Sequence, residues 1–475
     1  MKNQEDKGLK NIIKIILKCL LVFVLLVVVV NLIGPALPAK LTEEQKEQIG
    51  KTEYESEEAG NERILCVDDN NEALLWRLRM IESAREKIIF STFDFREDDS
   101  GTDVMAALYG AAERGVKVQI LLDDLNRIVQ LGNSDLFRVL CSHENIEVKS
   151  YNTVSLKNIF RENYRMHDKY LIIDDEMYLL GGRNTNDIFL GDTAQWINID
   201  REILVYETEP GKGESFLQLM DYFTEIWNES GADTLKPSVK KEKLKECSEI
   251  LKSRNASVCR ENSAIKNYDN WIEDTYPANK ITLIDNGVAA KKKKPVMLYE
   301  LEYIMKQGTD VVIQTPYVIC DNNMYEVLSN VSRSADVKII LNAVERGSNP
   351  WGCTDYMNNK KNIMKQGVTL YELMNEDAVH TKTILVDDNI SVVGSYNWDA
   401  RSTYLDTELM LVIDSKELNR HIRELNETYM EKSIEVLPDG TETVGAAYQG
   451  VELSDSKKWF YRILRVVIRP IRYLL

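Results

Sequence analysis

Two stretches of the chain carry the same chemically active residue types at the same spacing. They are RMHDKYLIIDDEMYLLGGRN, residues 165–184, and AVHTKTILVDDNISVVGSYN, residues 378–397. Each contains a histidine, a lysine two residues later, an aspartate five residues after the lysine, and an asparagine ten residues after the aspartate. Chance does not place two such matches in one chain, so the pattern predicts an internal duplication.

The segments that precede the two motifs also recur in the same order. Hydrophobic periodicity predicts a helix, a strand, a helix and a strand at 73–87, 88–95, 103–115 and 116–124, and again at 295–308, 310–319, 323–335 and 337–344. Helices that alternate with buried strands indicate the α/β class. Because each half supplies one motif histidine, we predict two similar α/β halves packed around one shared active site.

The N-terminus carries a strong membrane signal. Residues 12–33 are mostly Ile, Leu and Val, and as a helix they would extend about 33 Å, against a hydrocarbon core of about 30 Å. Lysines precede this run and acidic residues follow it. We therefore predict a retained single-pass anchor in the cell membrane, with the catalytic domain on the extracytoplasmic side. A cleaved signal peptide is the alternative interpretation.

Composition and charge divide the rest of the chain. With 475 residues, of which 44% are hydrophobic, two globular halves can each bury a core. The expected divisions are an anchor at 1–39, a stalk at 40–62, a first half at 63–232, an inter-half linker at 233–290, a second half at 291–435 and a tail at 436–475. The four lysines that follow the linker are interpreted as a solvated surface turn.

The paired motifs contain the groups that phosphodiester exchange requires. That reaction needs a nucleophile, a proton donor to the leaving oxygen, and positive charge over the non-bridging oxygens. Residues two apart on a strand point the same way, so the histidine and lysine of each motif share a face. The glycines before each asparagine allow the close approach that returns it to the histidine. The predicted site comprises His167, Lys169, Asn184, His380, Lys382 and Asn397.

A carboxylate on one ring nitrogen would orient each histidine for catalysis. Asp174 and Asp387 are the motif acids and are counted with the catalytic residues. Each lies five residues beyond its lysine, however, so a purely structural role fits equally well. Glu202 and Glu408 occupy matching places after the two motifs and are better candidates for orienting the histidines.

No metal or cofactor is predicted from the remaining acids, cysteines and histidines. The acid doublets at 68–69, 98–99 and 123–124 have no histidine at ligand spacing and are interpreted as turn residues. The seven cysteines show no paired metal-ligand spacing. His143 and His421 lie outside the repeated pattern and are interpreted as ordinary surface or helix residues.

The two motifs resemble the H-x-K-x4-D signature of the phospholipase D superfamily, in tandem over residues 63–435. Their flanks, GGRNTNDIF and GSYNWDARSTYLDTELMLVI, are similar to those of bacterial cardiolipin synthases of the C-type branch. The resemblance implies a metal-independent reaction in which His167 forms a phosphohistidine and His380 is general acid and then general base. The lysines and asparagines would hold the phosphate oxygens. Gly182 stands where the superfamily usually has a serine, and the missing hydroxyl would weaken one phosphate contact.

The resemblance and the two ends of the chain point to phospholipid substrates. It implies phosphatidyl transfer to phosphatidylglycerol, with phosphatidylethanolamine as a further donor. In the tail, arginines at 462, 465, 469 and 472 recur on one helical face beside apolar residues, which predicts contact with an anionic membrane surface. Docking of this helix on the protein's own core is the alternative.

The overall charge bears on the remaining alternatives. A net charge of −17 argues against a nucleic-acid partner held by general electrostatics. Hydrolysis of phospholipid, or of nucleic acid, by the same site stays open as the alternative activity, since the motifs serve phosphodiesters in general.

Overall fold

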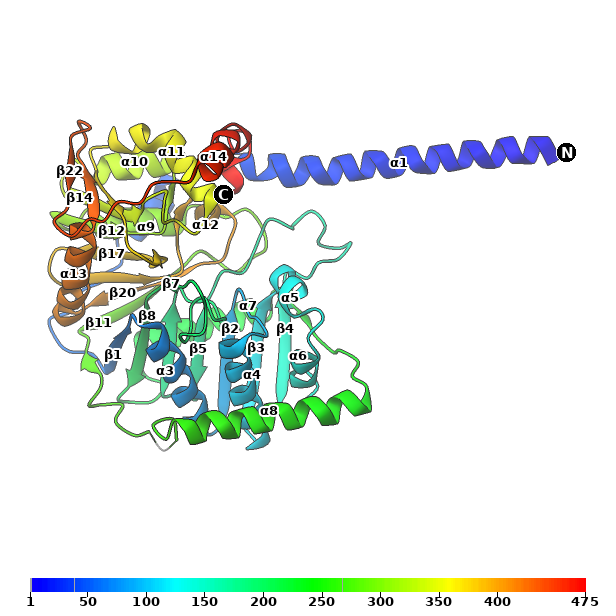
Figure 1. Cartoon of the computed structure of the whole chain (residues 1–475), viewed down its shortest axis with the longest axis horizontal. Coiled ribbons are helices and arrows are strands. Elements are labelled where there is room, and N and C mark those ends of the chain that lie inside the picture. Colours follow the sequence, from blue (N-terminus) through cyan, green and yellow to red (C-terminus); the bar gives the residue numbers. More distant parts are fainter. Residues whose placement is uncertain (1, 38, 267) are drawn as a thin grey trace.

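Two nine-stranded sheets form the body of the protein, and a long N-terminal helix projects away from it (Figure 1). The computed structural model describes residues 2–37, 39–266 and 268–475. In spatial order the first sheet contains β10 (Tyr276–Pro277), β1 (Glu62–Val67), β8 (Glu202–Glu207), β6 (Met177–Gly181), β5 (Tyr170–Ile173), β2 (Lys87–Thr92), β3 (Lys117–Asp123), β4 (Ile146–Tyr151) and β9 (Asp233–Thr234).

The second sheet repeats this plan. In spatial order it contains β11 (Lys280–Asp285), β20 (Leu409–Asp414), β18 (Ile390–Gly394), β17 (Thr383–Val386), β12 (Asp310–Gln314), β14 (Asp336–Asn342), β15 (Thr369–Leu373), β21 (Ser433–Val436) and β22 (Glu442–Val444). When the two spatial orders are aligned so that β1 of the first sheet matches β11 of the second, each following strand of the first sheet has a counterpart in the second. The counterparts also match in direction, since among the described strands of these two sheets only β2-β3-β4 and β12-β14-β15 pair in parallel. The predicted duplication and α/β class are confirmed.

Helices cover the outer faces of both sheets and also fill the space between them. Their bounds are α1 (Lys2–Ala36), α2 (Glu43–Ile49), α3 (Asn70–Ser83), α4 (Asp99–Glu113), α5 (Asp124–Leu131), α6 (Asp135–Leu140), α7 (Glu214–Trp227), α8 (Lys241–Glu261), α9 (Val296–Met305), α10 (Asn322–Val331), α11 (Pro350–Met364), α12 (Ala400–Tyr404), α13 (Lys416–Glu431), α14 (Asp455–Val467) and the 3-10 helix η1 (Arg472–Leu474). Helices α3, α4, α6 and α8 pack on the first sheet, and α9, α10 and α11 pack on the second. The central core joins both sheets with α7 and α13.

Short strand pairs join the two halves beside the motif histidines. β7 (Asn198–Ile199) of the first half pairs in parallel with β16 (Ala378–Val379), which ends one residue before His380. In the first motif, Met166 forms a parallel bridge with Thr407 of the second half. The remaining pair, β13 (Val318–Ile319) and β19 (Trp398–Asp399), lies within the second half. Each half therefore places its histidine against a segment of the other.

Two segments predicted as stalk and linker fold onto the body. In the stalk, Thr42 caps α2, and Leu41, Ile49 and Tyr54 are buried. In the linker, α8 buries its apolar side in the first core, and β11 is an edge of the second sheet. The lysine run is solvated only in part. Lys291 and Lys294 are exposed, whereas Lys293 is 7% exposed and donates hydrogen bonds to the backbone oxygens of Gly287 and Ala289.

Helix α1 is long and apolar enough to cross a membrane over Asn11–Ala36. Its described side chains in this span are largely exposed, as a lipid-facing helix requires. Where α1 ends, the Lys292 ammonium donates a hydrogen bond of 2.5 Å to the backbone oxygen of Pro35. The end of the anchor is thus held against the second half.

The C-terminal helix docks on the body, as the alternative interpretation of the tail predicts. Tyr461 and Leu464 of α14 are buried, and α14 lies against α11. Of the four aligned arginines, Arg465 donates to Asn358 at 2.8 Å, and Arg472 forms an ion pair with Asp355 at 2.9 Å. Arg472 therefore does not belong to a lipid-facing row. The exposed residues of α14 still include several large apolar ones, Trp459, Phe460, Ile463, Val466 and Val467.

Candidate active site

The two motif histidines lie on the extended segments that lead into equivalent central strands. His167 and Lys169 come directly before β5, and His380 and Lys382 come directly before β17. Both strands are buried on both faces, and their sequences YLII and TILV supply the apolar side chains this requires. The polar residues therefore collect where each strand emerges from the core.

A carboxylate from the second half holds the histidine of the first. Nδ1 of His167 lies 3.0 and 3.1 Å from the two carboxylate oxygens of Glu408. Those oxygens also accept hydrogen bonds from Ser395 Oγ at 2.5 Å and Ser402 Oγ at 2.6 Å. Donation from Nδ1 fixes the tautomer and leaves the Nε2 lone pair available for chemistry. Glu408 thus occupies the orienting position that its sequence predicts.

The second histidine has the reciprocal arrangement, but with a different acid. Nδ1 of His380 lies 2.6 Å from Oδ2 of Asp200, which belongs to the first half. The same oxygen accepts a hydrogen bond from Lys382 Nζ at 3.2 Å, and Oδ1 accepts one from the Arg201 backbone N–H at 2.8 Å. Sequence reasoning missed Asp200 and assigned its role to Glu202.

The assignment of Glu202 as an orienting acid is therefore wrong. Its carboxylate accepts a hydrogen bond of 2.7 Å from Arg77 and lies 3.5 Å from Nε of Arg183. The error came from aligning DRE at 200–202 with DTE at 406–408. Strand register gives the true match, because Gly181 pairs with Glu202 whereas Gly394 pairs with Met410. Asp200 and Glu408 both lie two residues before those partners.

The motif aspartates do not reach the histidines. Asp174 accepts hydrogen bonds from the backbone N–H groups of residues 85, 86 and 87 at 2.7–2.9 Å. Asp387 accepts equivalent bonds from Thr309 and Asp310 at 2.9 and 3.0 Å. Both lie at the far ends of β5 and β17, where their φ angles are 50° and 44°. A four-residue strand separates each from its lysine, about 13 Å. Their assignment as catalytic residues is corrected to a structural role.

The motif lysines lie beside their histidines, and the motif asparagines keep amide groups without an acceptor. Lys169 Nζ donates to the backbone oxygen of His167 at 2.5 Å. Asn184 Oδ1 accepts a hydrogen bond from the backbone N–H of Asp94 at 3.3 Å. Among the described residues, no group accepts a hydrogen bond from the Nδ2 of Asn184 or Asn397. Two ammonium groups and two amide donors are thus available to an oxyanion.

Two aromatic rings that sequence reasoning missed pack against the histidines. Phe93 meets His167 edge to face, with 4.9 Å between ring centroids, and Phe189 meets His380 in the same way at 5.1 Å. Both phenylalanines come from the first half. These contacts bury one side of each imidazole. No motif marks the two phenylalanines, so only the fold could identify them.

Burial and neighbouring positive charge favour the neutral form of both histidines. Burial lowers the pKa of His167 well below its usual value, and the charges of Lys169 and Lys382 lower it further. The same two kinds of effect, burial and the charge of Lys382, lower the pKa of His380 to about 4. Burial also lowers the pKa of Lys169 to about 8.

The two orienting acids differ in their pKa. Burial raises the pKa of Glu408 to about 7, although the charge of Lys169 and hydrogen bonds from Ser395 and Ser402 oppose the shift. Burial acts in the same direction on Asp200, but the charges of Lys382 and His380 outweigh it and hold the pKa below its usual value. Asp200 is therefore the more firmly ionised of the pair.

Comparison with known proteins agrees with this geometry. A family model described as "Cardiolipin synthase, PLD-like domain" matches residues 78–227 and 301–429, one segment in each half. This chain belongs to the phospholipase D-like family. The two segments contain all the histidines, lysines, asparagines and orienting acids described above.

Relatives of this phospholipase D-like protein include named lipid enzymes. Cardiolipin synthase C of Escherichia coli is 26% identical over 407 residues, which cover 76% of this chain and 84% of the relative. Cardiolipin synthase 1 of Staphylococcus epidermidis is 26% identical over 376 residues, with 78% and 69% covered. A crystal structure of phosphatidylserine synthase from Haemophilus influenzae has the same fold, with a TM-score of 0.64 at 14% identity, over 91% of this chain and 99% of that one.

The glycine that departs from the usual Gly-Ser of the family has a steric explanation in the phospholipase D-like protein. A Cβ at Gly182 would lie 2.5 and 2.6 Å from the two carboxylate oxygens of Asp200. The equivalent Ser395 instead bonds Glu408 through its hydroxyl. In both copies this position contacts the orienting acid, so the missing hydroxyl concerns an acid and not the predicted phosphate contact.

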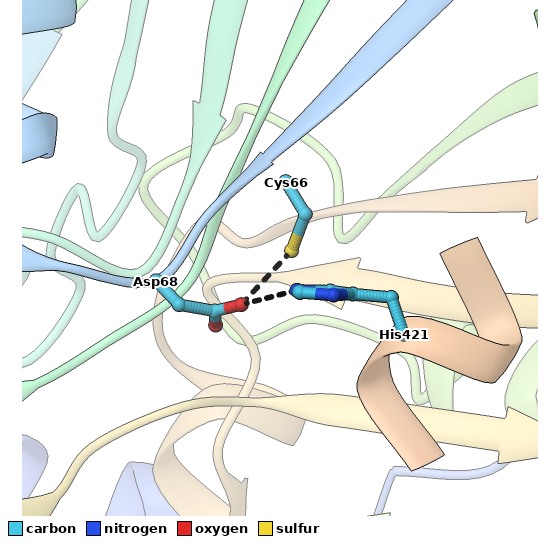
Figure 2. Close-up of side chains that lie close together, drawn as sticks. All are labelled: Cys66, Asp68 and His421. Atoms are coloured by element: carbon cyan, nitrogen blue, oxygen red, sulfur yellow. Dashed lines mark hydrogen bonds and ion pairs between the residues drawn. The ribbon is translucent and has the colours of Figure 1, made fainter. Parts of the chain in front are cut away.

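A second histidine-containing cluster also joins the halves of this phospholipase D-like protein. Figure 2 shows His421 of α13 facing Asp68 and Cys66 at the end of β1, and its Nε2 lies 3.1 Å from Asp68 Oδ2. Sequence spacing did not indicate this contact. One potential metal-binding atom from each of the three side chains lies within 4.8 Å of the other two. The other oxygen of Asp68 pairs with the buried Arg201 at 2.7 Å. Asp68 is thus already neutralised, and we assign the cluster to holding the halves together.

Proposed function

We propose that this protein is a membrane-anchored phosphatidyltransferase that forms cardiolipin through a phosphohistidine. The observation that carries the proposal is the paired arrangement of the histidines. Each has a buried carboxylate from the other half on Nδ1, and a motif lysine lies beside each; Nε2 of His380 is 3.4 Å from Lys382 Nζ. This set supplies a nucleophile, a proton carrier and positive charge for a phosphodiester.

In the first step, Nε2 of His167 attacks the phosphorus of a donor phospholipid. A nitrogen–phosphorus bond forms and the bond from phosphorus to the headgroup oxygen breaks. His380, protonated on both ring nitrogens when the anionic phosphodiester is bound, gives its Nε2 proton to that oxygen, and the free glycerol or ethanolamine leaves. Lys169 and Lys382, with the amides of Asn184 and Asn397, stabilise the charge on the non-bridging oxygens.

In the second step, Nε2 of His380 takes a proton from the terminal hydroxyl of phosphatidylglycerol. That oxygen bonds to phosphorus and the nitrogen–phosphorus bond breaks, which gives cardiolipin and restores both histidines. Water is the competing acceptor. Acceptor lipid is concentrated at a membrane surface, and this favours transfer over hydrolysis.

The difference between the two acids supports the division of roles. His380 must be an imidazolium when the first step begins, and it becomes one again in the second. An ionised carboxylate on Nδ1 stabilises that cation, and Asp200 is the acid whose pKa is lowered. His167 must present a neutral imidazole. Its partner Glu408 has a raised pKa, so this carboxyl group stabilises an imidazolium less than Asp200 does. The structure therefore favours His167 as the nucleophile.

The direct test is product analysis with the full-length protein in vesicles of phosphatidylglycerol, with and without phosphatidylethanolamine. We expect cardiolipin with free glycerol, and free ethanolamine where that donor is used. Activity should survive a chelator, because lysines and amides supply the positive charge. Phosphatidic acid as the sole product would show a hydrolase. Cleavage of oligonucleotides with the lipids left intact would show a nuclease.

A further inference from the structure

A compact loop links β4 to the first motif. It comprises residues 153–164, and Asn152 at its base donates hydrogen bonds to the backbone oxygens of Arg161 and Tyr164 at 2.7 and 2.8 Å. Inside it, Asn158 donates to the backbone oxygen of Thr153 at 2.9 Å. A loop whose two ends are held together in this way is an Ω-loop. We call it the 153–164 loop.

The tip of this loop and the helix beside it expose large apolar side chains. Leu156 is 84% exposed, and on α5 Val129 is 68% exposed. The two elements are joined, since the backbone N–H of Val154 donates to Asp124, the first residue of α5, at 2.8 Å. The exposed apolar residues of the combined surface are Leu125, Ile128, Val129, Val154, Leu156 and Phe160. An unpartnered apolar surface of this kind marks an interaction site.

Contacts with the membrane helix identify the partner of this surface. The ring of Phe160 meets the ring of Phe23 of α1 edge to face, with 6.2 Å between centroids. Asn31 of α1 donates to the backbone oxygen of Ile159 at 2.8 Å, and Asn163 donates to the backbone oxygen of Asn31 at 2.6 Å. Figure 1 shows that α1 leaves the body on the side that carries α5.

The contacts run from near the end of α1 to the middle of its apolar span. Asn31 lies five residues before the end of α1, or about 8 Å along its axis, and Phe23 lies about 12 Å further in. Phe160 therefore reaches into the part of α1 that spans the hydrocarbon core. Lys157 is exposed on the same loop. Its long side chain can extend back to the lipid phosphates.

We propose that the 153–164 loop and α5 insert their apolar side chains into the lipid leaflet beside α1, as a second attachment to the membrane. The loop ends at Tyr164, only three residues before His167, so the two are at most about 11 Å apart along the chain. Arg165 and Asp123, which caps α5, form a buried ion pair between the loop and the helix. Insertion therefore holds the nucleophile at a set height above the lipid phosphates.

A depth measurement tests this placement and does not depend on the proposed reaction. The full-length protein would carry Leu156→Cys in a Cys19→Ser, Cys66→Ser background, since the other five cysteines are buried. A small fluorophore attached to the introduced thiol reports the surroundings of the loop tip, and we call it the loop probe. The matched control is the same fluorophore on Lys416→Cys, an exposed position at the start of α13.

In phosphatidylglycerol vesicles we expect nitroxide-labelled lipid to quench the loop probe and aqueous iodide to quench it several-fold less than the control. Equal iodide quenching at both positions would overturn the proposal. Shielding from iodide without quenching by nitroxide lipid would also overturn it, because a protein partner such as a second copy would then cover the loop.

A second variant links insertion to catalysis, and this arm rests on the proposed function. Leu156→Asp with Phe160→Asp should slow phosphatidyl transfer on vesicles only several-fold, because α1 still anchors the protein. Transfer on monomeric short-chain phosphatidylglycerol should be unchanged, because that substrate does not require insertion of the loop. An equal loss on both substrates would contradict a role at the membrane. A wild-type protein inactive on both would count against the proposed function and not against the loop.

Discussion

The two copies of the motif have the same strand register but hold their histidines with different acids. Glu408 orients His167 with two serine hydroxyls as its own partners, whereas Asp200 orients His380 and is bonded to Lys382. The shorter aspartate fits only because Gly182 has no side chain, while the longer glutamate accommodates Ser395. The two copies thus share one backbone arrangement, and local differences give the two histidines different hydrogen-bond surroundings.

The acids also cross between the halves. Asp200 of the first half serves the histidine of the second, and Glu408 of the second serves the histidine of the first. Among the described residues, neither half alone supplies its motif histidine with an orienting carboxylate. Each histidine with its orienting acid is therefore complete only when both halves are present.

Replacing a motif histidine should have the largest effect on activity, and the two replacements should differ in whether the phosphoenzyme forms. We expect His167→Asn to lower activity by more than about 10³-fold and to abolish the phosphoenzyme, because the nucleophile is lost. His380→Asn should still accumulate the adduct from a nitrophenyl phosphodiester, whose leaving group needs no proton. Intact-protein mass spectrometry after rapid quenching measures both. An adduct found on His380 would reverse the two roles.

The two acids at 200 and 202 should separate catalysis from stability. Asp200→Asn should lower kcat by about 10²- to 10⁴-fold, because the amide does not stabilise the imidazolium of His380. Glu202→Gln should leave kcat of the folded protein nearly unchanged but cost about 3–5 kcal/mol of unfolding free energy, since it strips a buried partner from Arg77. Steady-state kinetics and urea unfolding measure the two effects. The opposite pattern would restore Glu202 as the orienting acid.

The position of the glycine and serine should show a smaller difference between the copies. Gly182→Ser should lower kcat about tenfold or more, because its Cβ would displace the Asp200 carboxylate. Ser395→Gly removes one hydrogen bond to Glu408, worth about 1 kcal/mol, and should lower kcat about fivefold. Kinetics on vesicles would compare the two. A harmless Gly182→Ser would mean that Asp200 does not need its present position.

The motif aspartates should matter least for the reaction. Burial alone would raise the pKa of Asp387, but hydrogen bonds from Thr309 and Asp310 lower it overall. A lowered pKa means that the stabilisation is present above the unfolded pKa, about 3.9, and is lost as the pH falls through the folded value.

Asp387→Asn should therefore cost about 1–2 kcal/mol of unfolding free energy at pH 7 and leave kcat nearly unchanged, since the side chain caps backbone N–H groups. The difference from the wild type should vanish at a pH below the folded pKa. Urea unfolding at both pH values measures this. A large loss of kcat without loss of stability would return Asp387 to the catalytic residues.

The sequence by itself determined the duplication, the fold class and most of the candidate site residues. Identical spacing in two copies identified the histidines, lysines and asparagines, because the family motif is local and a strand carries residues two apart on one face. The apolar run of α1 likewise indicated a membrane helix from its length alone.

Only the tertiary structure decided which acid serves which histidine and what the loops do. Asp200 and Glu202 are two residues apart, and strand register, not sequence similarity, selects Asp200. The acids reach their histidines across the halves, and the 153–164 loop meets α1 from a distant part of the chain. Such long-range contacts depend on how strands are ordered and sheets are packed, so no local spacing in the sequence could show them.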